Sequence, residues 1–286
     1  MTLNGRVYTP AVAQVNTGVV DFGIVHKGDV VTARNVSVTN TAAIAAPNDV
    51  LVGTIGGAAG PFNASGSLAG VAAQASDTSS FSVGLSTANA GVFNGSANAA
   101  FASRNPDMAD LAIGNSTVTL KAQVNNFATL ALQRVAGAGP LSASAGGYIL
   151  DFGTIQLGSA GLMAELGVFN VASGPADLLN GSFAFGAGAG FTFDGFGPFA
   201  GMAAGDGRDG LDIVFGSSSL GSFSQTFTIS SFGSNTSGYQ GQAFDTTVML
   251  RGTVVSVAAI PEPETYLLMA SGLIAVWVAR RRSRRS

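Results

Sequence analysis

The chain has 286 residues, of which only 10% are charged, and its formal net charge is −3. Before residue 261 it carries 8 Lys and Arg against 14 Asp and Glu, and this acidic, charge-poor body lacks the basic stripe that nucleic-acid binding requires. Cysteine is absent and His26 is the only histidine, which excludes thiolate nucleophiles and Cys-based metal centres and leaves any triad or His-rich metal site dependent on one residue.

The first 17 residues begin with a short pattern that returns twice. Residues 3–7 (LNGRV), 120–124 (LKAQV) and 250–254 (LRGTV) share the form Leu-x-small-x-Val. The second and third copies end a long repeat, so we expect residues 1–17 to hold the closing strand of a preceding module (residues 2–8) and a linker. On this hypothesis an upstream repeat and a signal peptide precede the chain as given.

Residues 18–126 and 148–257 repeat one pattern at a constant offset of 130, and we expect residues 127–147 to be a linker between them. Residues 19–28 (VVDFGIVHKG) match residues 149–158 (ILDFGTIQLG), and apolar positions agree as far as Val124 and Val254. Agreement at one offset over most of each unit indicates a tandem duplication.

Apolar residues in the matched segments are spaced by two, the periodicity of β-strands. Val118, Leu120 and Val124 face one side of an extended strand, while Thr119 and Lys121 face the other. Clusters of glycine, asparagine and serine between these segments favour turns. We therefore predict an all-β fold, with two tandem antiparallel β-sandwiches of the immunoglobulin-like type and one C-terminal transmembrane helix.

Each repeat opens with Asp-Phe-Gly. A protein kinase would also require a Gly-rich loop, a paired lysine and an His-Arg-Asp loop, which the sequence lacks. We expect instead that Phe22 and Phe152 fill the cores and that Gly23 and Gly153 permit a bulge in the first strand. The pattern VDFGxVxxG, followed by Thr-Asn-Thr at 39–41, resembles the choice-of-anchor D repeats of bacterial surface proteins. This resemblance implies immunoglobulin-like modules that occur with varied anchors.

Few side chains in the body are candidates for chemistry. Asp21 and Asp151 occupy equivalent positions, but they belong to separate modules and general acid–base pairs need a shared cleft, so we expect a structural role. His26 has Gln156 as its counterpart, so the repeat does not require histidine there, and we expect an exposed loop side chain. We predict no catalytic, cofactor-binding or metal-binding residue.

One acidic turn leaves two interpretations open. Asp206, Asp209 and Asp212 lie close together in a glycine-rich segment. Their carboxylates either ligate Ca²⁺ through oxygen or are simply solvated, because the spacing is not that of an EF-hand loop.

Residues 260–286 combine three kinds of chemistry in a fixed order. Pro-Glu-Pro is followed by an apolar run and by an arginine cluster at 280–285. Residues 266–279 carry no charge and would rise only about 21 Å as a helix, against a hydrocarbon core of roughly 30 Å. A buried core helix is the alternative, but it would place five arginines beside a core. We predict a transmembrane helix over residues 265–279, with Trp277 at the interface and the arginines on the cytoplasmic side.

This order of segments resembles the PEP-CTERM sorting signal of Gram-negative bacteria. The resemblance implies recognition by an exosortase, a membrane-embedded processing enzyme, and removal of the tail. The residues that would carry the signal are Pro261, Glu262, Pro263, Arg280, Arg281 and Arg282.

Together these patterns predict a non-enzymatic, exported protein of the cell surface or extracellular matrix, processed at its C-terminus by an exosortase-type enzyme. The alternative is an adhesion module that binds polysaccharide or protein at the cell surface. The expected partners are the exosortase, the inner membrane before processing and exopolysaccharide; no cofactor and no nucleic acid is expected.

Overall fold

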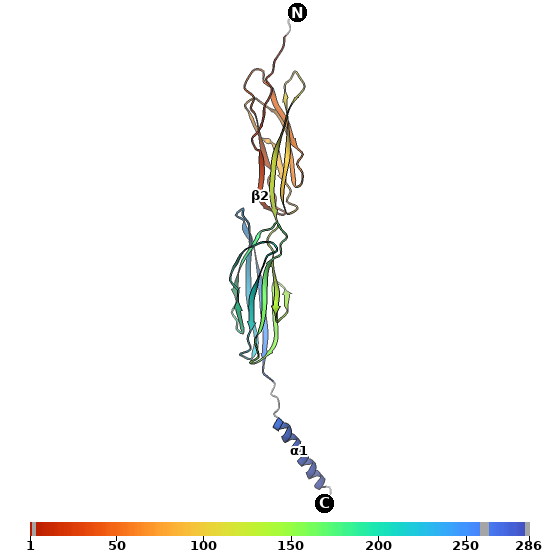
Figure 1. The fold of residues 1–286 in the computed structure, drawn as a ribbon, viewed down its shortest axis with the longest axis vertical. Helices are drawn as coiled ribbons and strands as arrows, with labels where there is room; N and C mark the ends of the chain where they lie inside the picture. The colour runs from red at the N-terminus through yellow and green to blue at the C-terminus, as the bar shows by residue number, and fades with distance from the viewer. Residues whose placement is uncertain (2–3, 258–262, 284–286) are drawn as a thin grey trace.

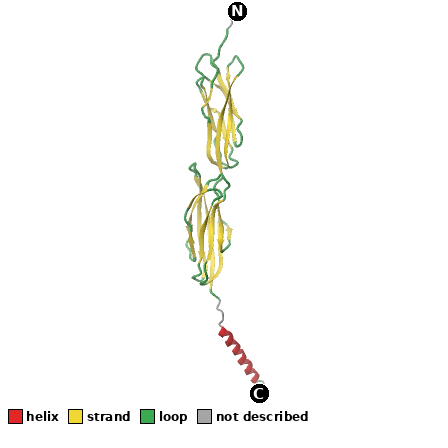
Figure 2. Ribbon diagram, viewed as in Figure 1, coloured by secondary structure: helices red, strands yellow, loops and turns green. Residues whose placement is uncertain are grey.

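The computed structural model describes residues 1, 4–257 and 263–283, and nearly all of them before residue 258 belong to β-strands and the turns between strands. Two β-sandwiches follow one another along a long axis, and a helix ends the chain (Figures 1 and 2). Each sandwich has its own hydrophobic core, the first drawn from residues between Ala11 and Ala122 and the second from residues between Ala128 and Val254. The predicted all-β class is confirmed.

The first sandwich has two layers that share one strand. One layer has the order β1-β3-β6-β5 and the other β5-β4-β7-β8-β2. The strands are β1 (Ala13–Val15), β2 (Val19–His26), β3 (Arg34–Asn40), β4 (Val50–Gly56), β5 (Phe62–Val71), β6 (Ser76–Leu85), β7 (Gly91–Arg104) and β8 (Leu111–Asn125).

Strand β5 crosses between the layers at Gly66. Before this point β5 pairs with β6, and after it β5 pairs with β4. Gly66 has a φ of 140°, and a Cβ atom there would lie 1.9 Å from the carbonyl oxygen of Ser80. The crossing therefore requires a residue without a side chain.

The second sandwich repeats this plan with two separate sheets, β10-β11-β18-β17-β13-β15 and β14-β16-β12-β9. The strands are β9 (Leu130–Gly137), β10 (Leu141–Ser144), β11 (Gly147–Gln156), β12 (Leu162–Asn170), β13 (Leu178–Phe185), β14 (Phe191–Asp194), β15 (Phe199–Met202), β16 (Gly207–Phe215), β17 (Gly221–Ser234) and β18 (Gln240–Val255). The counterpart of β5 is interrupted, giving β14 and β15. Arg208 holds the interruption by donating hydrogen bonds to the carbonyls of Gly195, Gly197 and Pro198.

The two segments expected to be linkers contain strands. Residues 127–147 include β9, which pairs with β12, and β10, which pairs with β11. Within residues 1–17, β1 pairs with β3. These strands are short or partly exposed, so their apolar alternation is too weak to stand out in the sequence. Of the strand predicted at residues 2–8, residues 2 and 3 lie outside the described residues and residues 4–7 are exposed and form no strand.

The Asp-Phe-Gly segments form the predicted bulges. The register of β2 against β8 shifts between Asp21 and Ile24, and that of β11 against β18 shifts at the equivalent place. Gly23 has a φ of 70°, and its N–H donates to Asp21 Oδ1 at 2.8 Å. Phe22 and Phe152 are buried in the two cores, as expected.

Both bulged strands pair in parallel with the last strand of their sandwich. The prediction of purely antiparallel sheets is therefore wrong at this one pairing in each sandwich. The reason is topological: after β2 and after β11 the chain crosses to the other layer and does not turn back in a hairpin.

The two sandwiches do not correspond at one constant offset along their whole length. Val50 of β4 lies opposite Arg104 of β7, and Leu178 of β13 lies opposite Ser234 of β17. Thus β7 and β17 correspond at an offset of 130, whereas β4 and β13 correspond at an offset of 128. The loop after β3 is longer by two residues than its counterpart, and Asp49 corresponds to Asp177.

Candidate functional sites: the C-terminal helix and the junction between the sandwiches

The C-terminal helix α1 runs from Pro263 to Arg282. Proline suits a first helical position, because its missing N–H would have no partner there. The helix does not stop before the arginine cluster: Arg280, Arg281 and Arg282 form its last turn, where positive charge complements the helix dipole. The other two predicted signal residues, Pro261 and Glu262, lie outside the described residues.

The large apolar side chains of α1 from residue 266 to residue 278 are exposed, between 40% and 76%. They are Tyr266, Leu267, Leu268, Met269, Leu273, Ile274, Val276, Trp277 and Val278. The guanidinium of Arg281 lies 4.9 Å from the ring centroid of Trp277, which is nevertheless 60% exposed. The described part of the body thus offers this helix no apolar partner, which argues against the buried-core interpretation.

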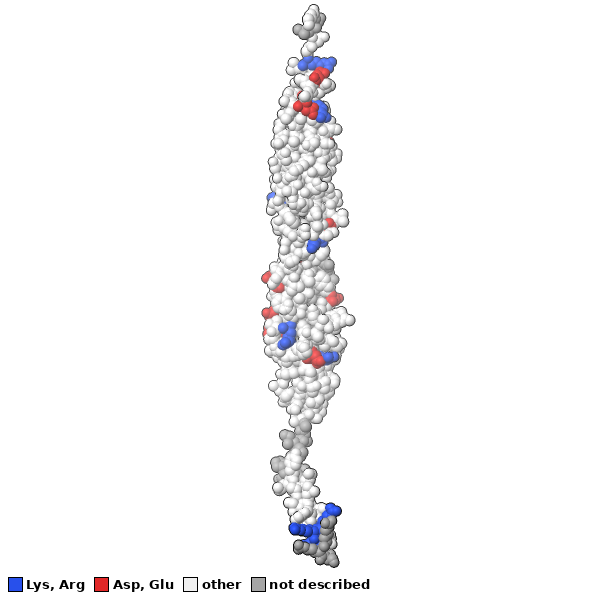
Figure 3. Space-filling model, turned by 90° about the vertical axis from the view of Figure 1, so that its right-hand side faces the viewer, with Lys and Arg blue, Asp and Glu red and all other residues white. Residues whose placement is uncertain are grey.

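Across residues 1, 4–257 and 263–283, we find no helix that is both long and apolar enough to cross a membrane. The charge distribution still sets α1 apart from the body. In Figure 3, charged residues are scattered over the sandwiches, while the arginines of α1 gather at the C-terminal end.

His26 ends β2, and it is buried rather than exposed as expected. Its Nε2 lies 2.7 Å from Oδ2 of Asp177, a residue of the second sandwich. Its ring stacks on Phe127 at a centroid distance of 4.2 Å, and its backbone N–H donates to Asp29. The prediction failed because His26 is buried by the neighbouring sandwich, which the comparison with Gln156 does not reveal.

Asp177 is fully buried and accepts hydrogen bonds through both carboxylate oxygens. Besides the contact with His26, its Oδ1 accepts from Nδ2 of Asn125 at 3.0 Å and from Nδ2 of Asn235 at 2.8 Å. The ring of Tyr239 lies 4.4 Å from that of His26. The pKa of Tyr239 is raised above its ordinary value. Burial is the main cause, and the negative charges of Asp177 and Asp29 add to it. The junction is therefore a buried polar cluster to which both sandwiches contribute.

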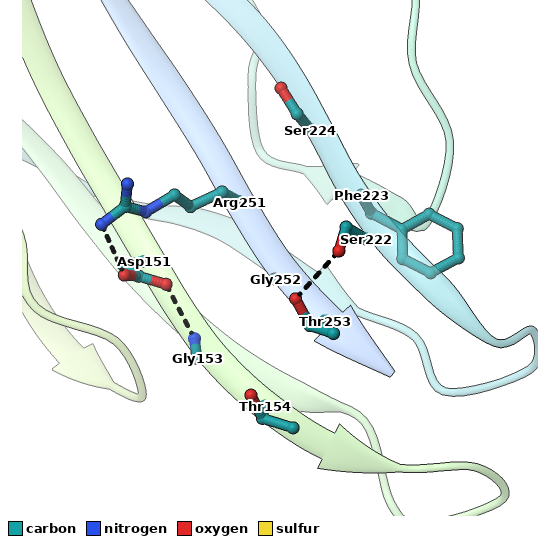
Figure 4. A pocket seen from close by; sticks show the side chains of 9 residues that line it. All are labelled: Asp151, Gly153, Thr154, Ser222, Phe223, Ser224, Arg251, Gly252 and Thr253. Carbon is teal, nitrogen blue, oxygen red and sulfur yellow. Dashed lines mark hydrogen bonds and ion pairs between the residues drawn. The ribbon is translucent and has the colours of Figure 1, made fainter. Parts of the chain in front are cut away.

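A surface depression of about 470 Å³ lies beside the bulge of β11 (Figure 4). Asp151 Oδ1 accepts from the N–H of Gly153 at 2.9 Å, and Asp151 Oδ2 lies 2.8 Å from Arg251. These two hydrogen bonds hold the pKa of Asp151 below its usual value, and the bond from Gly153 has the larger effect. The remaining polar side chains of the lining are hydroxyls of Ser and Thr, and no imidazole lines the depression to activate them. The contacts of Asp151 with Gly153 and Arg251 therefore stabilise the bulge of β11.

The other predicted candidates are dispersed. Asp21 and Asp151 each hold the bulge of their own sandwich and share no cleft. Asp206 lies in the turn before β16, where its carbonyl oxygen accepts from the N–H of Asn170. Among the residues that the structure describes, no three His, Asp or Glu side chains stand close enough to hold a metal ion.

Comparison with known proteins identifies the tail. Residues 259–284 match the family described as the PEP-CTERM protein-sorting motif. The match covers α1 and all but the last two residues of the predicted signal at 260–286, and it leaves the sandwiches unassigned. No curated protein sequence matches the chain.

Solved structures resemble the body in fold. The PapD-like domain 7 of human CEP192 is 10% identical, with a TM-score of 0.33, over 45% of this chain and 87% of that one. The YadV chaperone is 13% identical, with a TM-score of 0.27, over 83% and 99%. CfaE, the adhesive subunit of a fimbria of enterotoxigenic Escherichia coli, is 9% identical, with a TM-score of 0.30, over 89% and 90%. These likenesses concern β-sandwich architecture alone.

Proposed function

We propose that the chain is a non-enzymatic, exported protein of the cell surface or extracellular matrix, whose C-terminus is recognised and removed by an exosortase-type enzyme. The observation that carries this proposal is α1: an uncovered apolar helix that ends in three arginines, inside the segment that matches a sorting motif.

The exposure of α1 calls for a lipid environment. Burying one large apolar side chain stabilises a protein by about 1.5–3 kcal/mol, so a helix with many such side chains in water is strongly driven toward a membrane. Its uncharged part, residues 266–279, is about 9 Å shorter than a hydrocarbon core of roughly 30 Å. Mismatch costs fractions of a kcal/mol per Å, and arginine stems extend the reach of the helix toward the cytoplasmic surface. Such a helix serves transient insertion better than permanent anchoring.

The sandwiches are the part that is delivered. Their polar side chains stabilise the bulges and the junction. The one histidine, His26, is hydrogen-bonded to Asp177, which supports a structural role for it. On the proposed function, they are surface modules of the choice-of-anchor D kind.

Charge reversal of the tail tests this function. The full chain, preceded by a secretory signal peptide and with an epitope tag in the turn at residues 218–220, would be produced in a Gram-negative bacterium that carries an exosortase. Replacing Arg280, Arg281 and Arg282 by Glu should keep the protein cell-associated and unprocessed, because the three new negative charges outweigh the two arginines that remain at the cytoplasmic end. A matched variant with Lys at the three positions retains the charge and should be processed. Equal amounts of processed Glu and wild-type protein in the matrix fraction would contradict the proposal.

A second candidate, a sugar-binding adhesion module, is favoured by one observation. Phe185 is 44% exposed, and its ring centroid lies 4.5 Å from that of Phe193, which gives an aromatic surface suited to stacking on sugar rings. Binding of the purified chain to matrix polysaccharide, lost in Phe185→Ala, would support it. Binding that Phe185→Ala leaves unchanged would exclude this surface.

A further inference from the structure

The far end of the first sandwich repeats the geometry of the junction. Asp49 precedes β4 as Asp177 precedes β13. The N–H of Asp49 donates to the carbonyl of Thr9 at 2.9 Å, and the N–H of Asp177 donates to that of Asn126 at 3.0 Å. Thr9 and Asn126 also form equivalent parallel bridges with the residues before these aspartates. Thr9 therefore occupies the same position beside Asp49 as Asn126 occupies beside Asp177, and the residues before Thr9 correspond to those before Asn126.

The two aspartates differ in their partners. Both carboxylate oxygens of Asp177 accept hydrogen bonds, and two of the three donors come from the preceding sandwich: His26 and Asn125. Asp49 is only 4% exposed, and its Oδ2 accepts from Ser103 at 2.6 Å. Its Oδ1 is buried and has no hydrogen-bond partner among the described residues. A buried carboxylate oxygen without a donor destabilises the fold, so such an atom calls for an explanation.

The side chains around Asp49 are also exposed in the way expected of a junction whose second sandwich is absent. By the register above, Val7 is the counterpart of Val124 in β8, which is fully buried, yet Val7 is 88% exposed. Ile44 and Met108, in the two loops at this end, are also exposed. These loops lie beside the N-terminal segment at the top of Figure 1.

We propose that this N-terminal end of the first sandwich docks the opposite end of another β-sandwich, in tandem, through Asp49. The partner is a module of the same type as the first sandwich, which presents an imidazole at the end of its second strand and an amide at the end of its last strand. The imidazole donates to Asp49 Oδ1, with the amide beside it, as His26 and Asn125 together bind Asp177. This docking is independent of the sorting of the tail.

A chain of three sandwiches tests the docking. Residues 1–125 would be joined directly to residues 9–286, so that Asn125 of the added copy takes the place of Tyr8. A matched chain would carry six Gly and Ser residues at the join, which leaves all three sandwiches intact but separates the two ends. Hydrogen exchange would be measured at the backbone amides of residues 41–49 and 104–110 around Asp49.

Docking predicts exchange slower by about tenfold or more in the directly joined chain than in the spaced chain. It also predicts that His26→Ala in the added copy alone abolishes this protection. Equal exchange in the joined and spaced chains would overturn the proposal, as would protection that survives His26→Ala. A joined chain whose added copy fails to fold, while the spaced chain folds, would show a steric clash and would likewise overturn it.

Discussion

Individual side chains decide how the two sandwiches meet. Asp177 is a fully buried carboxylate that collects donors from His26, Asn125 and Asn235. Removing one partner from such a cluster leaves a buried polar atom unpaired, which costs more than the net value of the hydrogen bond. The residues of this cluster therefore act together.

Tyr239 reports on this cluster through its titration. Because burial and the carboxylates of Asp177 and Asp29 raise its pKa, its phenol should ionise above pH 10, later than exposed tyrosines. Replacing Asp177 by Asn should bring its pKa closer to 10. The folded state binds the proton more tightly, so this group lowers stability as pH rises through and beyond 10.

Absorbance at 295 nm measures the ionisation, and Tyr239→Phe identifies the residue. A late-ionising phase that persists in Tyr239→Phe would contradict the assignment.

The carboxyl group of Asp151 should make the stability of the second sandwich depend on pH in the acidic range. The pKa of its carboxyl is lowered in the folded state, by Gly153 first and Arg251 second, from the usual 3.8. Its contribution to stability is therefore present above about pH 4 and is lost as pH falls through the folded-state pKa. Asp151→Asn should lower the free energy of unfolding at pH 7 and have a smaller effect at pH 3. Denaturant unfolding at both values measures this, and an equal effect at both would contradict it.

At the scale of strands, much of the fold follows from the sequence. Alternating residues such as those of 118–124 predicted the strands, and Gly23 and Gly153 predicted the bulges, because both signals are local. The two-residue difference in the loop before β4 could not be seen, since no apolar pattern shared by the two repeats crosses that loop. For that reason the equivalence of Asp49 and Asp177, and with it the role of His26, emerged only from strand register.

The crossing strand β5 gives the sharpest prediction at this scale. Gly66→Ala should lower the free energy of unfolding by about 2 kcal/mol or more, because its Cβ would collide with the backbone of Ser80. Gly56→Ala, in the same sandwich, meets no atom within 4 Å and should change it by only about 0.5 kcal/mol. Denaturant unfolding of both variants measures the difference. Equal effects would contradict the crossing at Gly66.

The whole molecule depends on its junction for its extended form. His26 and Asp177 fix one sandwich against the other, so His26→Ala should let the two move independently while each keeps its own core. Small-angle X-ray scattering should then show a broader distribution of interatomic distances, and circular dichroism should show unchanged strand content. An unchanged distribution would contradict this role of His26 and would mean that the remaining contacts, such as that of Asn125 with Asp177, hold the junction.

On the proposed function the tail determines where this body goes, and its pattern was readable from the sequence because sorting signals are linear. Its helix continues through the arginines, which the sequence, with its abrupt change of charge at residue 280, did not indicate.

The most direct measurement is the C-terminal peptide of the mature protein, determined by mass spectrometry of the matrix fraction. The account predicts a protein that ends before or within residues 259–284 and lacks α1, and a full-length tail when the exosortase is deleted. A matrix-located protein that retains Trp277 and the arginines in the presence of the exosortase would contradict it.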